Sequence, residues 1–523
     1  GSRQGLRPTR PVHPRVHCGN VSRSGDPHGR PIRTVSSALQ AAAWGYAGTI
    51  GKLLIQFGAQ IVIARILGPD DYGQFAIGAL TISLSSYIAE AGIGSAIVQR
   101  KNLDAQTINF IFSLQALIGL FMSLLIWIGA GLLGHYLDSD PQAILVVQIM
   151  GLACVLNAAA STPNNLLRRA LDYKHLQFCQ LAGFSTGYLA IGVPLAVAGC
   201  GIWSLVAAWL VQSSVGLLTV WAIAKPDVQF LFNHPDRTTI LRFGKHATLS
   251  NIANWGNGNG DKLVIAHGFP IAQLGIYNAA SNLLSTLITQ ILSTLQSVIF
   301  SATARSSEDP AVVTKTYLTL LEAGCFLMMP LFVCIGGFDD ALLQGIYGPQ
   351  WTDSGALITP LATGIAAYGV TGLLTPLLWS NGQIDKESRL QLLSASLMMV
   401  VVAGTAALSH DVVATAWAAC AGLWARLILI SYSIAQWLGV SPKRVALFIG
   451  CGVSASGLAQ GLVIQARQSL ESRDMTGAAL LAGLILVAIL VTMLVCSVLT
   501  LIGPEGHLRH IAIRISTRAR PSK

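Results

Sequence analysis

The sequence predicts an all-α polytopic membrane protein of about fourteen transmembrane helices, arranged as two six-helix lobes followed by two extra C-terminal helices. Apolar residues form 53% of the chain and charged residues only 11%, whereas roughly 25% of the residues of a soluble protein are charged. Apolar stretches of about 20 residues, the length that crosses a bilayer, recur along the chain. The segment 62–75 is also repeated, without a gap, at 264–277. Together these observations indicate a membrane protein with an internal duplication.

We expect a spanning helix in each of fourteen apolar ranges, joined by short connections without an inserted soluble domain. The ranges are 41–65, 73–98, 107–134, 142–163, 175–198, 201–223, 246–268, 275–300, 316–338, 354–379, 389–408, 412–437, 445–465 and 477–502. Residues 1–33 are rich in Arg, Pro, Gly and His and show no apolar period, so we expect a disordered tail there and see no cleavable signal. The nine cysteines show no CxxC or Cys/His spacing, and so they give no sign of a disulfide framework or a zinc site.

The connecting loops alternate in charge along the chain. One set is basic and the opposite set is acidic, as Arg168-Arg169 and Asp339-Asp340 illustrate. Because basic residues in short loops mark the cytoplasmic side, both termini are predicted to be cytoplasmic. The outside loop with Arg467 is an exception. The predicted units are a basic disordered tail (1–33), an N-terminal lobe (34–225), a cytoplasmic linker (226–245), a C-terminal lobe (246–440), two further helices (441–503) and a basic cytoplasmic tail (504–523).

The repeat also duplicates a polar helical face. Lys52, Gln56 and Gln60 are spaced at i, i+4 and i+8 in the first span, which places them on one face of a helix. In the register of the repeat, three residues of the seventh span overlie them. These are Asn254, Gly258 and Lys262. A charge near the middle of a span costs about 2.5–3.5 kcal/mol on insertion scales, so this face should contact protein or water. Since each repeat holds an even number of spans, the lobes should be related by a pseudo-two-fold axis along the membrane normal.

We expect polar residues of spans one, seven and twelve to line a hydrated lumen that binds a polar headgroup. The candidates are Lys52, Gln56, Gln60, Asn251, Asn254, Lys262 and Arg426. Two alternatives stay open: these groups satisfy one another between helices, or Lys262 extends outward to the interface. Glu90 and Asp261 are candidates for a coupling-ion site, because a carboxylate in a desolvated site readily takes up a proton.

Other polar and aromatic residues near the span ends have simpler expected roles. Arg65 and His267 occupy equivalent repeat positions and are expected to extend to the interface. A polar wall is expected along span eight, formed by Asn278, Asn282, Gln290 and Gln296. Four tryptophans are expected to be interfacial anchors, namely Trp44, Trp203, Trp351 and Trp437. No catalytic triad, metal-ligand cluster or cofactor motif is visible, and the basic residues form no nucleic-acid-binding stripe.

Two motifs resemble a known family. The opening A-W-x-x-x-G-x-x-G-K-L-L-x-Q (Ala43 to Gln56) and the segment A-R-I-L-G-P-D-D-Y-G-Q-F (Ala64 to Phe75) are similar to the polysaccharide transporters of the MOP flippase superfamily, in the xanthan and colanic acid exporter branch. The resemblance covers residues 34–500 and implies a MATE-like fold. It further implies alternating-access transport of undecaprenyl-pyrophosphate-linked oligosaccharide repeat units, from the cytoplasmic to the periplasmic leaflet of a bacterial inner membrane, for exopolysaccharide, capsule or O-antigen biosynthesis. Basic lumen residues would bind the anionic substrate, and Lys52 fits that expectation.

The resemblance leaves partners and rival functions open. The implied partners are the lipid-linked oligosaccharide and membrane lipids, with a polysaccharide polymerase or co-polymerase and H⁺ or Na⁺ coupling as further options. The alternatives are a drug/cation antiporter or a lipid II flippase of the same superfamily and, from another class, a membrane glycan polymerase or ligase. The short outside loops disfavour such an enzyme, and the basic lumen candidates Lys52 and Arg426 disfavour a cation antiporter.

Overall fold

The computed structural model describes residues 51–502, apart from 52, 54, 91–93, 95–96, 98–102, 137–140, 171, 236, 305–309, 353 and 474, and apart from some helical side chains. A first helical segment, Ile55–Ile66, is followed by α2 (Pro69–Glu90), α4 (Ala105–Tyr136), α5 (Pro141–Arg169), α6 (Tyr173–Phe184), the π-helix η1 (Ser185–Gly192), α7 (Val193–Val197), α8 (Trp203–Ala224), α9 (Arg237–Gly268), α10 (Ile271–Ala304), α11 (Pro310–Ala323), the π-helix η2 (Gly324–Met328), α12 (Met329–Ile335), α13 (Asp340–Tyr347), α14 (Gly355–Ser380), α15 (Ile384–Ser409), α16 (Val412–Leu438), α17 (Pro442–Glu471) and α18 (Gly477–Ile502). Each of the fourteen expected ranges contains helix, and the described residues form no strand.

The chain is a multi-pass membrane protein. Ten of the described helical segments are long and apolar enough to cross a bilayer. The other four expected spans fall on Ile55–Ile66, which is short, and on α2, α9 and α10. The all-α membrane fold is therefore confirmed, whereas the count of fourteen crossings stays a prediction. The expected tail at 1–33 and the start of the first expected span lie outside the described residues.

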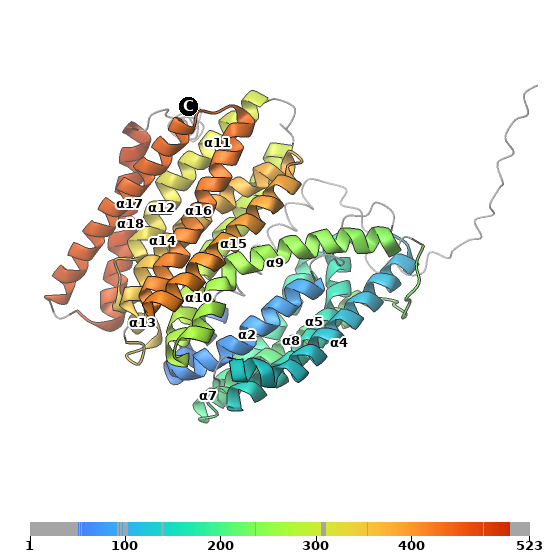
Figure 1. Ribbon diagram of the computed structural model, residues 1–523. Helices are drawn as coiled ribbons and strands as arrows, with labels where there is room; N and C mark the ends of the chain where they lie inside the picture. Colours follow the sequence, from blue (N-terminus) through green and yellow to red (C-terminus); the bar gives the residue numbers. More distant parts are fainter. Residues whose placement is uncertain are drawn as a thin grey trace, which may run out of the picture.

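The helices form two groups (Figure 1), which we call the N-terminal group (Ile55–Ile66 and α2 to α8) and the C-terminal group (α9 to α18). They meet near the starts of α2 and α10 and diverge towards the other ends of these helices. Within the N-terminal group, α5 packs against α2, α4 and α8. Within the C-terminal group, α14 packs against α10, α12 and α16. The two groups contact each other through α2, which packs against both α9 and α10.

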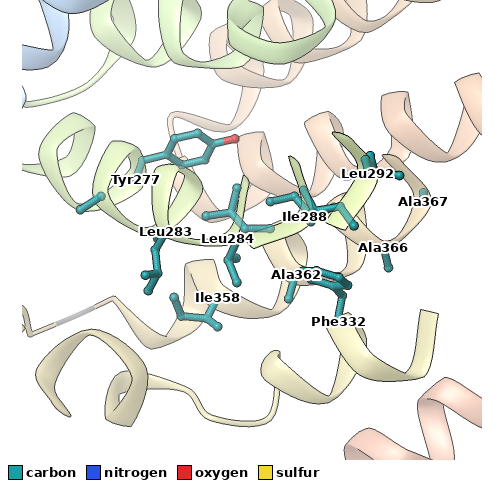
Figure 2. Close-up of a cluster of buried hydrophobic side chains, with 14 of the residues drawn as sticks. Tyr277, Leu283, Leu284, Ile288, Leu292, Phe332, Ile358, Ala362, Ala366 and Ala367 are labelled. Atoms are coloured by element: carbon teal, nitrogen blue, oxygen red, sulfur yellow. The ribbon is translucent and has the colours of Figure 1, made fainter. Parts of the chain in front are cut away.

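A dense apolar core holds the C-terminal group together. Figure 2 shows Leu284 and Ile288 of α10 facing Ile358 and Ala362 of α14, with Phe332 of α12 beside them. All of these side chains are fully buried or nearly so. Because lipid offers no hydrophobic driving force between helices, such an interface depends on close van der Waals packing, which small residues such as Ala362 permit.

The connection between the two groups lies along the beginning of α4. The main-chain N–H of Leu231 donates to Ser113 Oγ (2.7 Å), and that of Gln229 donates to Asn109 Oδ1 (3.1 Å). Helix α9 begins at Arg237, within the range 226–245 that the sequence predicted as a linker. Part of the predicted linker is therefore helical, and the boundaries of the linker stay a prediction.

The sequence repeat has a direct structural counterpart where α2 crosses α10. A Cβ atom at Gly73 would overlap the main-chain oxygen of Ile271, and a Cβ atom at Gly275 would overlap that of Pro69. Gly73 and Gly275 are equivalent in the repeat register, and so are Pro69 and Ile271. The contact is therefore reciprocal, as a pseudo-two-fold relation requires, and only glycine allows the two backbones to approach so closely.

A set of hydrogen bonds joins the two groups beside this crossing. The indole N–H of Trp351 donates to Ala64 O (2.9 Å), and Gln350 Nε2 donates to the main-chain oxygens of Ala64 (3.1 Å) and Arg65 (2.9 Å). In return, Arg65 Nε donates to Ile346 O (2.9 Å). We call Ala64, Arg65, Gln350 and Trp351 the latch. Trp351 is 0% exposed, so its expected role as an interfacial anchor is wrong.

Helices α17 and α18 hold the C-terminal side of the latch in place. Arg467 of α17 forms an ion pair with Asp339, the residue before α13. Gly345 of α13 packs closely against Leu481 of α18. The basic residue Arg467, which departed from the loop-charge pattern, thus has an acidic partner. Because Asp339 neutralises the charge of Arg467, this arginine adds no net positive charge to the loop that was predicted to lie outside.

Replacement of Trp351 by phenylalanine should weaken the latch. The ring remains, but Ala64 O loses a buried hydrogen bond, and we expect a destabilisation of about 1 kcal/mol. Thermal unfolding of the detergent-solubilised protein measures the effect. Trp417→Phe is the matched control, because Trp417 is 46% exposed on the outer surface of α16. Equal unfolding temperatures for the two variants would contradict the assignment.

Candidate functional site

A cavity of about 510 Å³ lies between α2, α5, α8 and the middle of α9. Amide, hydroxyl and aromatic side chains dominate its wall, together with one guanidinium group, and the lining residues that the structure describes include no carboxylate. The lining residues are Ile82, Ser83, Ser86, Tyr87, Asn157, Ser161, Asn164, Asn165, Arg168, Trp209 and Asn251. Such a wall suits a ligand that is rich in hydroxyl groups and carries negative charge. We refer to it as the polar cavity.

One face of α5 supplies most of the polar groups. Asn157, Ser161, Asn164 and Arg168 are spaced at i, i+4, i+7 and i+11, so they lie on one side of the helix. The sequence predicted that this span ends at residue 163, yet Pro163 lies inside α5, which continues to Arg169. Membrane helices tolerate an interior proline where neighbouring helices and side chains satisfy the freed backbone groups.

A buried network behind the polar cavity fixes this face of α5. Gln115 of α4 is 0% exposed. Its Nε2 donates to Ser161 Oγ (2.8 Å), and its Oε1 accepts from Thr162 Oγ1 (2.7 Å). Asn165 Nδ2 also donates to Ser161 Oγ (3.4 Å). Gln115 therefore orients Ser161 directly and Asn165 through Ser161, while it does not line the cavity itself.

Replacement of Gln115 by leucine should destabilise the protein by about 1–3 kcal/mol, because buried polar partners on α5 lose their hydrogen bonds. It should also reduce transport, since Ser161 and Asn165 lose their fixed orientation. The control is Gln148→Leu, which removes the bond from an α5 side chain to Trp127 O at a partly exposed site. A Gln115→Leu variant that matches this control in thermal unfolding and in transport would contradict the proposed role.

Among the predicted lumen residues that the structure describes, one lies at the polar cavity. Asn251 lines it, whereas Gln56, Gln60 and Asn254 are half-buried and are not among its lining residues. Lys52 and the side chain of Glu90 lie outside the described part of the chain. The expected place of Lys52 in a hydrated lumen therefore stays a prediction.

Lys262 is directed inward. Its side chain is 4% exposed overall, and Nζ donates to Asn282 Oδ1 of α10 (2.9 Å). Asn282 in turn donates to Asn278 Oδ1 (3.2 Å). The alternative in which Lys262 extends to the membrane interface is thus wrong, because α10 offers it a hydrogen-bond acceptor at short range. Asn278 and Asn282, expected on a polar wall, form this contact.

Asp261 belongs to a smaller cavity of about 70 Å³ inside the C-terminal group. Its Oδ2 accepts a hydrogen bond from Tyr277 Oη (2.5 Å), and its Oδ1 accepts from the main-chain N–H of Lys262 (2.8 Å). Asn257 and Ser281 contribute further oxygen atoms to the same wall. In the described part of the chain, no three His, Cys, Asp or Glu residues form a metal-binding group.

Arg426 is placed differently from the expectation. It is 4% exposed within the C-terminal group, and its guanidinium carbon lies 5.8 Å from the centre of the Tyr368 ring. Glu387 of α15 interacts with it electrostatically. It is not among the residues that line the polar cavity. The structure therefore places Arg426 beside an aromatic ring and an acidic side chain inside the C-terminal group.

Sequence reasoning missed most of the polar cavity. Arg168 was assigned to a loop, and Asn157, Asn164 and Trp209 were not singled out. The periodic Asn/Ser/Asn/Arg spacing in α5 was the available signal. This spacing is harder to recognise than a charge in the middle of a span, because this face carries its only charge at the end of the helix.

The sequence matches the polysaccharide biosynthesis protein family over residues 62–356. It is 24% identical over 346 residues to the succinoglycan biosynthesis transport protein ExoT of Rhizobium meliloti (strain 1021), which covers 66% of this chain and 68% of that protein. It is 21% identical over 376 residues to the lipopolysaccharide biosynthesis protein WzxC of Escherichia coli (strain K12), with 70% and 75% covered.

The fold is similar to solved structures of the MOP superfamily. The lipid II flippase MurJ in its inward closed conformation superposes with a TM-score of 0.69 at 12% identity, covering 87% of this chain and 98% of that one. An inward-facing multidrug resistance MATE family transporter superposes with a TM-score of 0.51 at 15% identity, covering 74% and 94%. Since the family match spans more than half of the 523 residues, the chain belongs to the polysaccharide biosynthesis protein family and has the fold of the MOP superfamily.

Proposed function

We propose that this protein is a flippase for undecaprenyl-pyrophosphate-linked oligosaccharide repeat units, which it moves from the cytoplasmic to the periplasmic leaflet. The polar cavity is the observation that carries the proposal: its lining residues supply amide and hydroxyl groups, an indole ring and Arg168, with no carboxylate. The names of the relatives, which refer to succinoglycan transport and lipopolysaccharide biosynthesis, support the same class of substrate.

The chemistry of the substrate requires such a cavity. Each sugar hydroxyl that entered hydrocarbon without a hydrogen-bonding partner would cost several kcal/mol, so the glycan needs a polar path. The polyprenyl chain has no such need and can stay in the bilayer beside the protein. Arg168, exposed at the end of α5, provides a planar guanidinium group of the kind that binds phosphate oxygens in pairs.

The energy for net outward movement has two candidate sources. A pyrophosphate with about two negative charges gains roughly 4–5 kcal/mol when it moves outward across about 100 mV. H⁺ or Na⁺ antiport is the second source, and we propose Asp261 as its site, because it lies in a small enclosed cavity with Tyr277, Asn257 and Ser281. Glu90 remains the other proposed carboxylate for this role.

The proposed setting is the bacterial inner membrane with both termini in the cytoplasm. We propose that residues 34–225 and 246–440 form the two lobes that alternate in access, and that 441–503 forms the appended pair of helices. The last turn of α5 carries Arg168 and Arg169, and we assign this end of the helix to the cytoplasmic side because basic residues in short loops mark that side. A polysaccharide polymerase or co-polymerase is the proposed recipient of the flipped repeat unit.

A lipid II flippase is the second candidate, favoured by the superposition on MurJ. The two functions share the lipid pyrophosphate and differ in the glycan. A drug or cation antiporter is disfavoured by Arg168, because a fixed positive charge at the polar cavity opposes the binding of a cation. We further propose that the protein is not a glycan polymerase or ligase, since every outside loop predicted from the sequence is short.

The lipid-linked oligosaccharide pool in cells lacking the gene tests the proposal. The flippase predicts that single, intact repeat units accumulate in the cytoplasmic leaflet, and that the wild-type gene removes them. Repeat units that reach the periplasm but stay unpolymerised would contradict it and indicate a polymerase. Accumulation of lipid II instead would favour the second candidate.

A further inference from the structure

The two ends of the polar cavity carry different chemistry. Helices α5 and α8 run in the same direction, because one helical crossing (α6 to α7) separates them. They are aligned by the indole N–H of Trp221, which donates to Ala159 O (3.0 Å). Trp209 lies three turns before Trp221, and Arg168 lies nine residues after Ala159. At about 1.5 Å per residue, Trp209 and Arg168 are therefore roughly 30 Å apart along the helices.

Trp209 has the properties of a platform for a sugar ring. It lines the polar cavity and meets Phe75 of α2 edge to face, with ring centroids 5.9 Å apart. Its indole N–H is buried, and no acceptor for it occurs among the described residues. An indole presents a large apolar face together with one hydrogen-bond donor. A pyranose offers the complementary surface, since its C–H face is apolar and its rim carries hydroxyl groups.

The wall between these ends is uncharged. Asn157, Ser161 and Asn164 lie along it on consecutive turns of α5. Amide and hydroxyl groups both donate and accept hydrogen bonds, so they can pair with sugar hydroxyls that act as donors or as acceptors. Gln115 holds Ser161 in place from behind, which gives this wall a fixed arrangement. The cavity thus passes from a cationic mouth through a neutral polar wall to an aromatic end.

We propose that the glycan enters this cavity with its distal sugars foremost, so that the pyrophosphate binds at Arg168 and a sugar ring remote from it stacks on Trp209. The inference rests on the proposed flippase function and adds the orientation of the substrate. It makes Trp209 a specificity-determining residue, because only a glycan several rings long spans the distance from Arg168. A lipid pyrophosphate with a single sugar binds at the mouth alone.

The test uses purified protein in proteoliposomes with two probes. One is the intact lipid-linked repeat unit from cells lacking the gene, and the other is undecaprenyl pyrophosphate with a single hexose. The readout is the ratio of their transport rates. Trp209→Leu should lower the ratio of intact repeat unit to single hexose about tenfold, equivalent to 1.4 kcal/mol. Trp209→Phe, which keeps a ring, should retain most of the wild-type ratio.

Two further variants separate the possible outcomes. Trp417→Leu removes an exposed tryptophan of α16 and should leave the ratio at its wild-type value. Arg168→Gln should slow both probes together. An unchanged ratio in Trp209→Leu, whether both rates fall or neither does, would overturn the inference and assign Trp209 to packing. If the wild type transports neither probe, the flippase function itself is wrong.

Discussion

Replacement of Gly275 by valine should strongly reduce transport. A Cβ atom at this position overlaps the main-chain oxygen of Pro69, and a backbone atom cannot move aside as a flexible side chain can. Overpacking of this kind costs about 1–3 kcal/mol, and here it acts at the crossing that brings the two helix groups together. We expect transport to fall about tenfold or more and the equilibrium to shift towards the state in which α2 and α10 separate.

Labelling by a membrane-impermeant maleimide distinguishes this shift from simple unfolding. The reporter is a cysteine at Thr289, an exposed position on the polar side of α10, in a variant without the native cysteines. Gly275→Val should increase its labelling from the periplasmic side, and Gly73→Val should do the same, because the two glycines make reciprocal contacts. Gly268→Val is the control, since no atom lies within 4 Å of a Cβ there. Equal labelling in all of these variants would contradict a role of Gly73 and Gly275 in closing the crossing of α2 and α10.

Replacement of Arg168 by glutamine should reduce transport about ten- to a hundredfold, because a hydrogen bond to a charged group contributes about 1.5–3 kcal/mol. Arg168→Lys should recover only part of the loss, since an ammonium group keeps the charge but lacks the planar fork. The affinity for undecaprenyl pyrophosphate, measured with the purified protein, should fall in parallel and should depend less on salt than in the wild type.

Arg237→Gln is the matched control for this variant. Arg237 is an exposed arginine at the first residue of α9, on the same predicted side of the membrane. It is not among the residues that line the polar cavity. The same loss in both variants would show that Arg168 acts through general surface charge rather than through a specific contact with phosphate.

The sequence predicted the helices and their duplication well. Hydrophobic periodicity is a local property, so the ranges of the apolar helices followed from it directly. Because Gly73 recurs as Gly275, the sequence predicted that the two repeats are related by symmetry. The reciprocal contact of these two glycines with the opposite backbone agrees with that relation. The latch was not predictable, because it joins Arg65 to residues nearly 300 positions later through main-chain oxygens, which leave no trace in side-chain patterns.

The functional residues were harder to predict, because a buried polar group has the same sequence signature in a lumen and in a helix interface. Asn251 and Arg426 illustrate the two outcomes, since one lines the polar cavity and the other packs over Tyr368. The α5 face was obscured by Pro163, at which the predicted span ended. Because α5 continues past Pro163 to Arg169, Arg168 lies on the helix and at the mouth of the cavity.

The most direct test of the account is transbilayer movement of the purified lipid-linked repeat unit in proteoliposomes that contain only this protein. The glycan starts in the inner leaflet, and its exposure to an external glycosidase is followed over time. We predict that wild-type protein exposes it much faster than protein-free vesicles do, and that Arg168→Gln removes most of the difference. Equal exposure with and without the wild-type protein, under an imposed potential and ion gradient, would contradict the central claim.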